Sequence, residues 1–222
     1  MDIGGTSQAV SAYMTRVYGW MLAGVLITAL TSWFVLDSEV GFRIVSSGLF
    51  FPLIIAEFVL VFAISGWVMK MSSSVAALCF LAYSFLNGLT LSVILSNYTG
   101  ESIVNTFVTV AVMFGALSLY GLTTKRNLSA IGQFMFMGLI GLVVASVLNI
   151  FIASSGLNFI INIIGVIVFS GLTVYDNQKI RENFLEYGGE LASKTAILGA
   201  LTLYLDFINL FLFILRLLGR RD

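Results

Sequence analysis

Seven stretches of predominantly apolar residues run along the chain, and short polar breaks separate them. Each stretch approaches or exceeds the roughly 20 residues that an α-helix needs to cross a hydrocarbon core about 30 Å thick. The breaks are rich in Asp, Lys, Asn, Ser and Gly, which are typical of loops between spanning helices. The pattern predicts seven transmembrane helices, over about 17–36, 48–69, 75–95, 103–122, 131–152, 157–175 and 195–218.

Composition supports a membrane protein over a soluble one. Hydrophobic residues make up 59% of the 222 residues, charged residues make up 10%, and the mean hydropathy is +1.03. A soluble domain cannot bury so much apolar surface. We therefore expect an all-α membrane protein, a single polytopic domain over 1–222, with the lipid bilayer as its environment. The first apolar stretch lacks a small-residue cleavage site, so we expect a retained helix and no removed signal peptide.

The rarity of His and Cys excludes several classes of catalytic and metal site. The chain has no His and one Cys, Cys79, which excludes Ser/His and Cys/His catalytic arrangements, thiolate metal sites and an internal disulfide. Lys and Arg are scattered and form no basic stripe, which argues against nucleic acid as a partner. We expect no enzymatic activity and no cofactor.

Lys and Arg predict the orientation. With the N-terminus inside, seven of them fall on the inner side and four on the outer side. Basic residues concentrate on the cytoplasmic side of membrane proteins, so the N-terminus is predicted to be cytoplasmic. The outer set is Arg43, Arg216, Arg220 and Arg221. Its three C-terminal members would fit the inner side better, so a last segment that enters the membrane and returns is the alternative. That segment is long and lacks a central Gly or Pro, which favours a full span.

The last apolar stretch carries a carboxylate near its middle. A helix that starts at Thr195 places Asp206 roughly 16 Å along its axis, close to the centre of the bilayer. An Asp at that depth costs about 2.5 to 3.5 kcal/mol even on lenient insertion scales, so it is expected to face protein, water or a partner charge. One helical face contains Thr195, Thr202, Asp206, Asn209, Phe213 and Arg216. We expect this face to point into the bundle.

The sixth stretch has a matching polar face, made by Asn162, Gly165, Phe169, Thr173 and Asp176. Asp176 is expected to end its helix on the inner side, where the last helix begins, so the carboxyl groups of Asp176 and Asp206 could meet. Their expected depths differ by about two turns. If they do meet in a poorly hydrated site, both cannot ionise cheaply and they would share a proton. Without that proton the pair would be an oxygen-rich site suited to calcium.

Glu57 is another acid at membrane depth, in the second stretch. Its candidate partners are Asn87, Asn149 and Arg216. Both a structural hydrogen bond or ion pair and a place along an ion or proton path remain open for it. An intramembrane aspartyl protease would also place two Asp residues on adjacent helices, but the residues that flank Asp176 and Asp206 are not the small or Gly-rich ones expected there.

Two motifs, SGLTVYDNQKI at 170–180 and LTLYLDFINLFLFILRLLG at 201–219, closely resemble the Bax inhibitor family of membrane proteins in its bacterial branch. Further matches are VYGWM at 17–21, NGLTLS at 87–92 and SLYGLTTKRNLS at 118–129, so the resemblance covers nearly the whole chain. It implies a seven-helix bundle with the last helix central, a proton-sensitive calcium leak, and a hydrogen-bonded sensor made by Asp176 and Asp206. Family members also hold a basic latch residue at the inner end of the second helix. Here Val68 stands about where that arginine would fall, and Lys70 is the basic residue nearby.

These observations predict a pH-sensitive calcium leak channel of the bacterial inner membrane. Calcium is the expected transported ion, bound by Asp176 and Asp206, and the expected supporting residues are Glu57, Lys70, Asn87, Asn209 and Arg216. The alternative is a non-conducting regulator that binds a membrane protease or another bilayer protein. A proton-coupled solute transporter is a third possibility, for which the sequence offers no recognisable solute-binding group.

Overall fold

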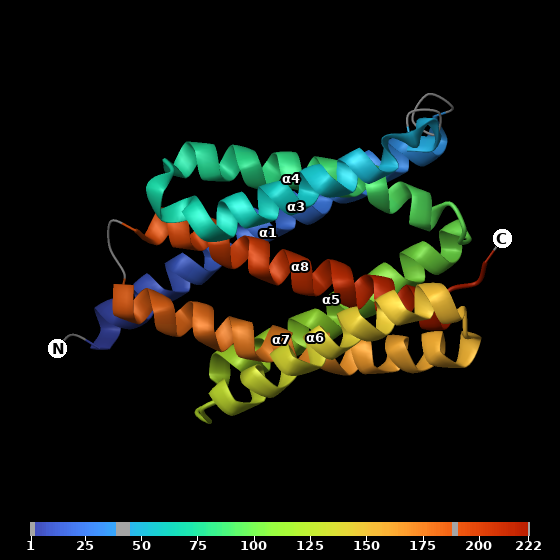
Figure 1. The fold of residues 1–222 in the computed structure, drawn as a ribbon. Coiled ribbons are helices and arrows are strands. Elements are labelled where there is room, and N and C mark those ends of the chain that lie inside the picture. The colour runs from blue at the N-terminus through green and yellow to red at the C-terminus, as the bar shows by residue number, and fades with distance from the viewer. Residues whose placement is uncertain (1–2, 39–44, 188–190, 222) are drawn as a thin grey trace. The chain divides into compact units, whose positions relative to one another are not determined.

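The computed structural model describes residues 3–38, 45–187 and 191–221, and the loop residues Glu39 and Arg43 lie outside these ranges. The described chain is helical, and its strand-like pairing is limited to an isolated bridge between Tyr98 and Arg221. The helices are α1 (Ile3–Asp37), η1 (Val45–Leu49), α3 (Phe50–Trp67), η2 (Val68–Lys70), α4 (Ser73–Leu95), α5 (Gly100–Thr123), α6 (Ser129–Ile152), α7 (Ser155–Tyr187) and α8 (Ala192–Leu218) (Figure 1). Within this part of the chain, seven helical segments are long and apolar enough to cross a membrane, which confirms the predicted all-α membrane fold.

Two helices extend well beyond their apolar stretches. The first begins at Ile3 instead of near residue 17, and α7 continues to Tyr187 instead of ending near Asp176. The prediction that Asp176 ends its helix is therefore wrong. The residues after it include Gln, Lys, Arg and Glu, which favour helix almost as well as Leu does. Tertiary contacts also hold this extension, because Phe184 stacks on Tyr13 of α1 with ring centroids 4.4 Å apart.

The second span is the least regular. A π-helical turn precedes α3, and within it Gly48 has φ = +88°, a left-handed conformation that favours glycine. Pro52 follows in the first turn of α3, where a missing backbone N–H is tolerated. The span closes with the 3₁₀ turn η2. The C-terminal end of this span, where the family resemblance predicted a basic latch residue, is thus a tight turn and not a continuous α-helix.

The helices group into two compact units, each made from two separate parts of the chain. The first unit is Met1–Asn97 with Glu182–Tyr204, and the second is Tyr98–Arg181 with Leu205–Asp222. The last helix contributes its first half to one unit and its second half to the other. Its most apolar window is 72% buried, whereas the other six spans are 6 to 44% buried. Among the described spans, the last helix is therefore the most buried.

In the first unit, α1 and α3 both pack against α4 (Figure 1). Small residues make the α1–α4 contact close: a Cβ added at Gly24 would lie 2.6 Å from the Phe80 ring. Hydroxyl groups reinforce this contact, since Ser32 Oγ donates to the carbonyl oxygen of Gly88 at 2.8 Å. The two helices are therefore held at a defined axial register.

In the second unit, α5, α6 and the second half of α8 pack against α7. A Cβ at Gly165 of α7 would lie 2.5 Å from the Phe213 ring of α8, and a Cβ at Gly132 of α6 would lie 2.5 Å from the Tyr175 ring of α7. Close approach through small residues is the usual way that helices pack in membranes. The predicted polar face of α7 is thus turned towards α8.

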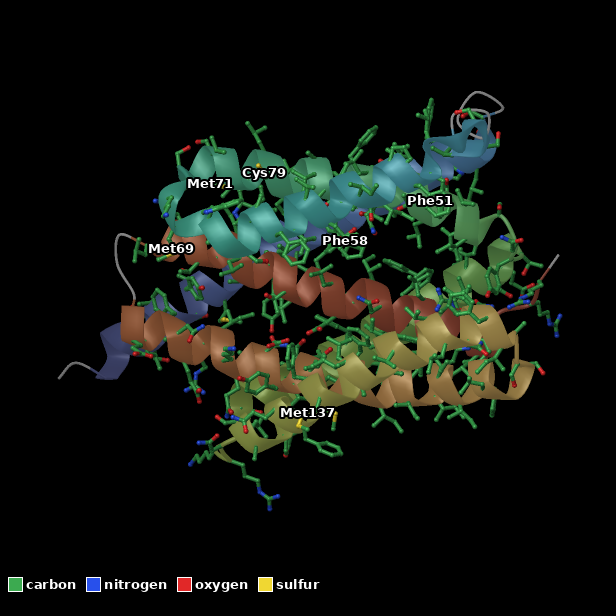
Figure 2. The ribbon with its side chains drawn as sticks, in the orientation of Figure 1. Phe51, Phe58, Met69, Met71, Cys79 and Met137 are labelled. Atoms are coloured by element: carbon green, nitrogen blue, oxygen red, sulfur yellow. The ribbon has the colours of Figure 1, made fainter. Side chains whose placement is uncertain are left out.

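The outer faces of α3 and α6 are apolar and exposed. Each of these spans is only 6% buried in its most apolar window. Phe51 and Phe58 on α3 and Met137 on α6, labelled in Figure 2, are 73%, 59% and 70% exposed. Such side chains are compatible with lipid tails, so these faces are suited to contact the bilayer.

Candidate functional site

The two membrane-depth aspartates meet in the second unit. Asp176 lies 11 residues before the end of α7 at Tyr187, and Asp206 lies 14 residues after the start of α8 at Ala192. At 1.5 Å per residue these positions are about 16 and 21 Å from the two helix ends, so the levels agree within about one turn. Their carboxyl groups lie within hydrogen-bonding reach of each other. The extension of α7 beyond Asp176 therefore removes the mismatch in depth that the apolar pattern predicted.

The surroundings of Asp206 are dry. Its side chain is 4% exposed, and Oδ2 is fully buried with no hydrogen-bond donor among the other described residues. Two ionised carboxylates only accept hydrogen bonds, so a bond between Asp176 and Asp206 requires a proton on one of them. A buried acceptor without a donor is costly. A shared proton, or a cation in its place, would satisfy Oδ2.

Asp176 is less buried and has a positive charge nearby. Lys179, one turn further along α7, interacts electrostatically with it, and the Lys179 ammonium also lies 5.4 Å from the centre of the Tyr175 ring. Among the described residues, no group of three or more His, Cys, Asp or Glu could hold a metal ion. The site is therefore a pair of carboxyl groups with one basic neighbour.

The residues directly after Asp176 anchor its helix. Asn177 is fully buried, and its Nδ2 donates to Ser118 Oγ of α5 at 3.1 Å and to the carbonyl oxygen of Thr173 at 2.7 Å. Sequence reasoning missed Asn177 because the polar stretch after Asp176 was interpreted as a loop. The signal that would have found it is its spacing of four residues from Thr173, which places it on the same helical face.

Gln178 ties α7 to the connection between α5 and α6. Its Oε1 accepts from the backbone N–H of Leu128 at 3.0 Å, and its Nε2 donates to the carbonyl oxygen of Arg126 at 2.8 Å. Arg181 adds a third bond, from Nη1 to the carbonyl oxygen of Leu122 at 3.2 Å. Together these contacts fix the position of α7 around Asp176 relative to α5.

Glu57 belongs to a second polar cluster, which lies in the first unit. Thr90 Oγ1 donates to its Oε1 at 2.7 Å, and Asn87 Nδ2 donates to its Oε2 at 3.2 Å. Tyr204 of α8 donates to Asn87 Oδ1 at 3.0 Å, and its hydroxyl lies 2.6 Å from Thr28 Oγ1. Thr28 Oγ1 also donates to the carbonyl oxygen of Ser84 at 2.8 Å. Each hydroxyl has one proton, so Thr28 and Asn87 compete for the single proton of Tyr204. Thr90 and Asn87 thus donate to the two oxygens of Glu57, and Tyr204 connects Asn87 to α8.

The structure selects one of the three predicted partners of Glu57. Asn87 binds it, whereas Asn149 closes the end of α6, where its Oδ1 accepts from the backbone N–H of Ser154 at 3.1 Å. Arg216 lies in the last turn of α8, with its guanidinium 5.8 Å from the centre of the Phe213 ring. Sequence reasoning missed Thr90 and Tyr204, although both lie in motifs that resemble the family.

Two further predicted residues, Asn209 and Lys70, make local or few contacts. Asn209 Nδ2 donates to the carbonyl oxygen of Leu205 in its own helix at 2.8 Å. Lys70 is exposed in η2, beside the buried Val68. A different lysine closes this turn, since Lys194 Nζ donates to the carbonyl oxygen of Met69 at 3.1 Å.

The comparisons with known proteins cover almost the whole chain. The sequence model of the family described as "Inhibitor of apoptosis-promoting Bax1" matches residues 10–222. The chain belongs to the Bax inhibitor family. It is 48% identical over 217 residues to inner membrane protein YbhL of Escherichia coli K12, a match that covers 96% of this chain and 93% of that protein. An uncharacterized protein of Borreliella burgdorferi is 44% identical over 94% of this chain and 92% of its own length, and YrjE of Lactococcus lactis is 42% identical over 96% and 92%.

The aspartate pair and the Glu57 cluster both lie within the part of the chain that the Bax inhibitor family model matches. The resemblance inferred from the two aspartate motifs is therefore confirmed as family membership. Relatives from three bacteria match over more than nine-tenths of their own lengths, so this chain and those proteins share one helical architecture from end to end.

Proposed function

We propose that this protein is a pH-sensitive calcium leak channel in which the Asp176–Asp206 pair controls the passage of the ion. The observation that carries the proposal is the buried side chain of Asp206, which lies within hydrogen-bonding reach of Asp176 and whose Oδ2 has no donor among the described residues. An ionisable side chain at this depth is costly and rare, and it marks a functional site by default. Exchange of a shared proton for a cation would give the Asp206 carboxylate a function at this depth.

The proposed switch follows from charge. With one proton shared, the two carboxyl groups are hydrogen-bonded and hold α7 against α8. When the proton leaves, two negative charges face each other, and at 4 Å their repulsion amounts to about 4 kcal/mol at an effective dielectric constant of 20. That repulsion loosens the α7–α8 contact and attracts a hard cation. The path is therefore closed at low pH and opens as the pH rises.

Calcium fits the opened pair as transported cargo. It prefers oxygen ligands and accepts about 6 to 8 of them in flexible geometry, so two carboxyl groups and water would complete its shell. Lys179 is the charged group that acts on Asp176, and it limits how long a cation stays beside the pair. Weak binding is what a conducting path requires.

The other predicted residues have supporting roles in this proposal. Glu57 and Asn87 hold α8 through the Tyr204 hydroxyl, so they determine how freely the last helix moves. Asn209 and Arg216 lie on the same α8 face as Asp206, towards its C-terminal end. Lys70, which is exposed, is the basic residue near the position where the family resemblance implies a latch.

Flux measurements test the proposal. Purified protein in liposomes that contain a calcium indicator should admit calcium at a rate that rises with pH, and Asp176→Asn and Asp206→Asn should each abolish this dependence. Glu182→Gln is the matched control, because Glu182 is an exposed acid on the same helix as Asp176. Absence of flux at every pH would overturn the channel. A membrane protein that co-purifies with both Asn variants, together with absent flux, would support the regulator instead.

We propose the bacterial inner membrane as the location, with the N-terminus in the cytoplasm. The printed name of the E. coli relative and the seven-to-four distribution of Lys and Arg support this. Alkaline phosphatase fused after residue 222 should be active, because an odd number of spans places the C-terminus outside. The same enzyme fused after residue 125 should be inactive.

A further inference from the structure

A cavity of about 250 Å³ lies in the second unit, where α5 begins and α8 ends. Its polar lining residues come from the first turns of α5 and from the segment after α8: Glu101, Ser102, Asn105, Thr106, Thr109 and Arg220. Those of α5 follow spacings of three and four, so they form one side of the helix. Neither Asp176 nor Asp206 lines this cavity, so it is a site apart from the aspartate pair.

Backbone hydrogen bonds fix the two segments that border the cavity. Arg220 donates its backbone N–H to Ser102 Oγ at 3.0 Å, and its carbonyl oxygen accepts from the backbone N–H of Thr99 at 3.1 Å. The next residue, Arg221, pairs with Tyr98 in the isolated bridge, so the segment after α8 lies beside the start of α5 (Figure 1). The cavity is therefore formed before any ligand binds, as small-molecule sites usually are.

Thr106 lines the cavity with a hydroxyl group that has no partner. Its side chain is 5% exposed, and its hydroxyl has no hydrogen bond to the other described residues. Other threonines of the spanning helices, such as Thr109, Thr173 and Thr202, donate to the carbonyl oxygen four residues before them. A buried hydroxyl without a partner is costly. The Thr106 hydroxyl is therefore expected to bond a group that occupies the cavity.

Asn105 and Ser102 add further hydrogen-bonding capacity. The side-chain amide of Asn105 has no hydrogen bond to the other described residues, although it lies in a spanning segment where lipid tails offer none. Ser102 Oγ accepts from Thr99 Oγ1 at 3.0 Å as well as from the Arg220 N–H, so its own proton is available to an acceptor. Three neighbouring side chains of α5 can therefore donate to a ligand in the cavity.

The cavity is lined by one charged residue of each sign. Glu101 lies in the first turn of α5, Arg220 follows α8, and both side chains are exposed. Neither has an ion-pair partner among the described residues, so both are available to a charged ligand. A ligand with a single charge would be attracted by one of them and repelled by the other. A zwitterion satisfies both.

The groups along α5 follow the order of groups in a phospholipid. Glu101 lies at the membrane surface, where the span begins, and Asn105 and Thr109 lie roughly 6 and 12 Å further along the axis. Near the depth of Thr109, the apolar side chains of Val108 and Val112 are 56% and 70% exposed and are suited to lipid tails. Charged, polar and apolar groups of α5 thus match a charged headgroup, ester groups and acyl chains.

We propose that this cavity binds an ammonium–phosphate zwitterion, the headgroup of an ethanolamine phospholipid. Arg220 and the Ser102 hydroxyl bind the phosphate, Glu101 accepts from the ammonium, and Asn105 and Thr106 donate to the ester oxygens below. The cavity is smaller than the roughly 300 to 1,000 Å³ of sites for drug-sized ligands, so it admits the headgroup and leaves the acyl chains outside. The site requires neither calcium nor the aspartate pair and goes beyond the proposed channel function.

Native mass spectrometry of the delipidated protein in detergent tests the choice of ligand. Phosphatidylethanolamine should bind at one site several-fold more tightly than phosphatidylglycerol, which lacks the ammonium. It should also bind more tightly than phosphatidylcholine, because a fully methylated ammonium has no N–H to donate to Glu101. All three probes carry the same acyl chains. Equal affinities for the three lipids would overturn the proposal.

Two substitutions test the residues that hold the headgroup. Thr106→Val removes the hydroxyl and keeps nearly the same shape, so the affinity for phosphatidylethanolamine should fall several-fold. Thr123→Val is the matched control, because Thr123 lies at the other end of α5, outside the cavity, and bonds within its own helix. Arg220→Gln should also weaken binding and keeps the backbone bonds of an exposed residue. Unchanged affinity in both Thr106→Val and Arg220→Gln would overturn the site.

Glu101→Gln tests recognition of the ammonium. The amide is neutral, so the preference for phosphatidylethanolamine over phosphatidylglycerol should disappear. A preference as large as that of the wild type would contradict the binding of a zwitterion between Glu101 and Arg220.

Soluble phosphoethanolamine distinguishes the lipid from the free headgroup. In excess it should fail to displace phosphatidylethanolamine, because it lacks the ester groups that Asn105 and Thr106 bind. Displacement at a concentration equal to that of the lipid would assign the cavity to the free zwitterion and not to the lipid. These binding measurements need no calcium flux, so they can be interpreted whether or not the protein conducts.

Discussion

Asp206 and Asp176 lie within hydrogen-bonding reach in the second unit, and the buried Oδ2 of Asp206 has no donor among the other described residues. Two acceptors that face each other need a proton between them. This relationship makes the α7–α8 contact depend on protonation, since the two helices attract through one shared proton and repel without it.

An amide at position 206 should lock the pair. Asp206→Asn supplies a donor to the Asp176 carboxylate, so the contact forms without a proton and persists as the pH rises. We expect low calcium flux at all pH values and a melting temperature that no longer depends on pH, both measured on the purified protein. Asp206→Ala is the control, because it removes the carboxyl group without providing a donor. A pH response in the Asn variant equal to that of the wild type would contradict the shared proton.

The wild-type pH profile should have a definite sign and slope. Calcium flux should increase with pH as the shared proton is lost, because a coupled pair of acids releases its two protons in separate steps and only the second step removes the shared proton. Stopped-flow measurements across a pH series, with equal pH on both sides of the membrane, would give the curve. If calcium flux decreased with rising pH, the protonated pair would belong to the open state and not to the closed one.

The Tyr204 hydroxyl should contribute measurably to stability. Tyr204→Phe leaves Asn87 Oδ1 and Thr28 without this buried partner, and such losses cost about 1 to 3 kcal/mol of unfolding free energy. Tyr83→Phe is the control, since the Tyr83 ring packs edge-on against Tyr204 at 5.7 Å and its ring would remain. Chemical denaturation in detergent would compare the two variants. Equal unfolding free energies of the two variants would mean that the Tyr204 hydroxyl does not stabilise the Glu57 cluster.

Two glycines of α5 should respond in opposite directions to Ala. A Cβ at Gly121 would collide with the backbone carbonyl oxygen of Val174 in α7, whereas a Cβ at Gly115 would have no atom within 4 Å. Gly115→Ala should therefore stabilise by about 0.5 to 1 kcal/mol, the usual gain from removing a helical glycine. Gly121→Ala should destabilise by about 1 to 3 kcal/mol, as overpacking does. Thermal unfolding of both variants under one condition would check the signs.

The amino-acid sequence by itself determined the class of the protein and the helical faces on which its two aspartates lie. Lipid offers no hydrogen bonds, so a spanning segment must be a long apolar helix, and such segments are visible in the pattern of residues. The same periodicity placed Asp206 and Asp176 on polar faces. The family motifs then connected the two aspartates, and the match over residues 10–222 confirmed the membership.

Only the tertiary structure decided where the helices end and which side chains meet. The polar residues after Asp176 continue α7 because Asn177 and Gln178 find buried partners on other elements, which no local pattern reveals. Glu57 binds Asn87 instead of its other candidates because close contacts set the axial register of the helices. Periodicity gives a residue its face. Where a helix ends, and the register and rotation between neighbouring helices, decide its depth and its partner, and these depend on tertiary packing.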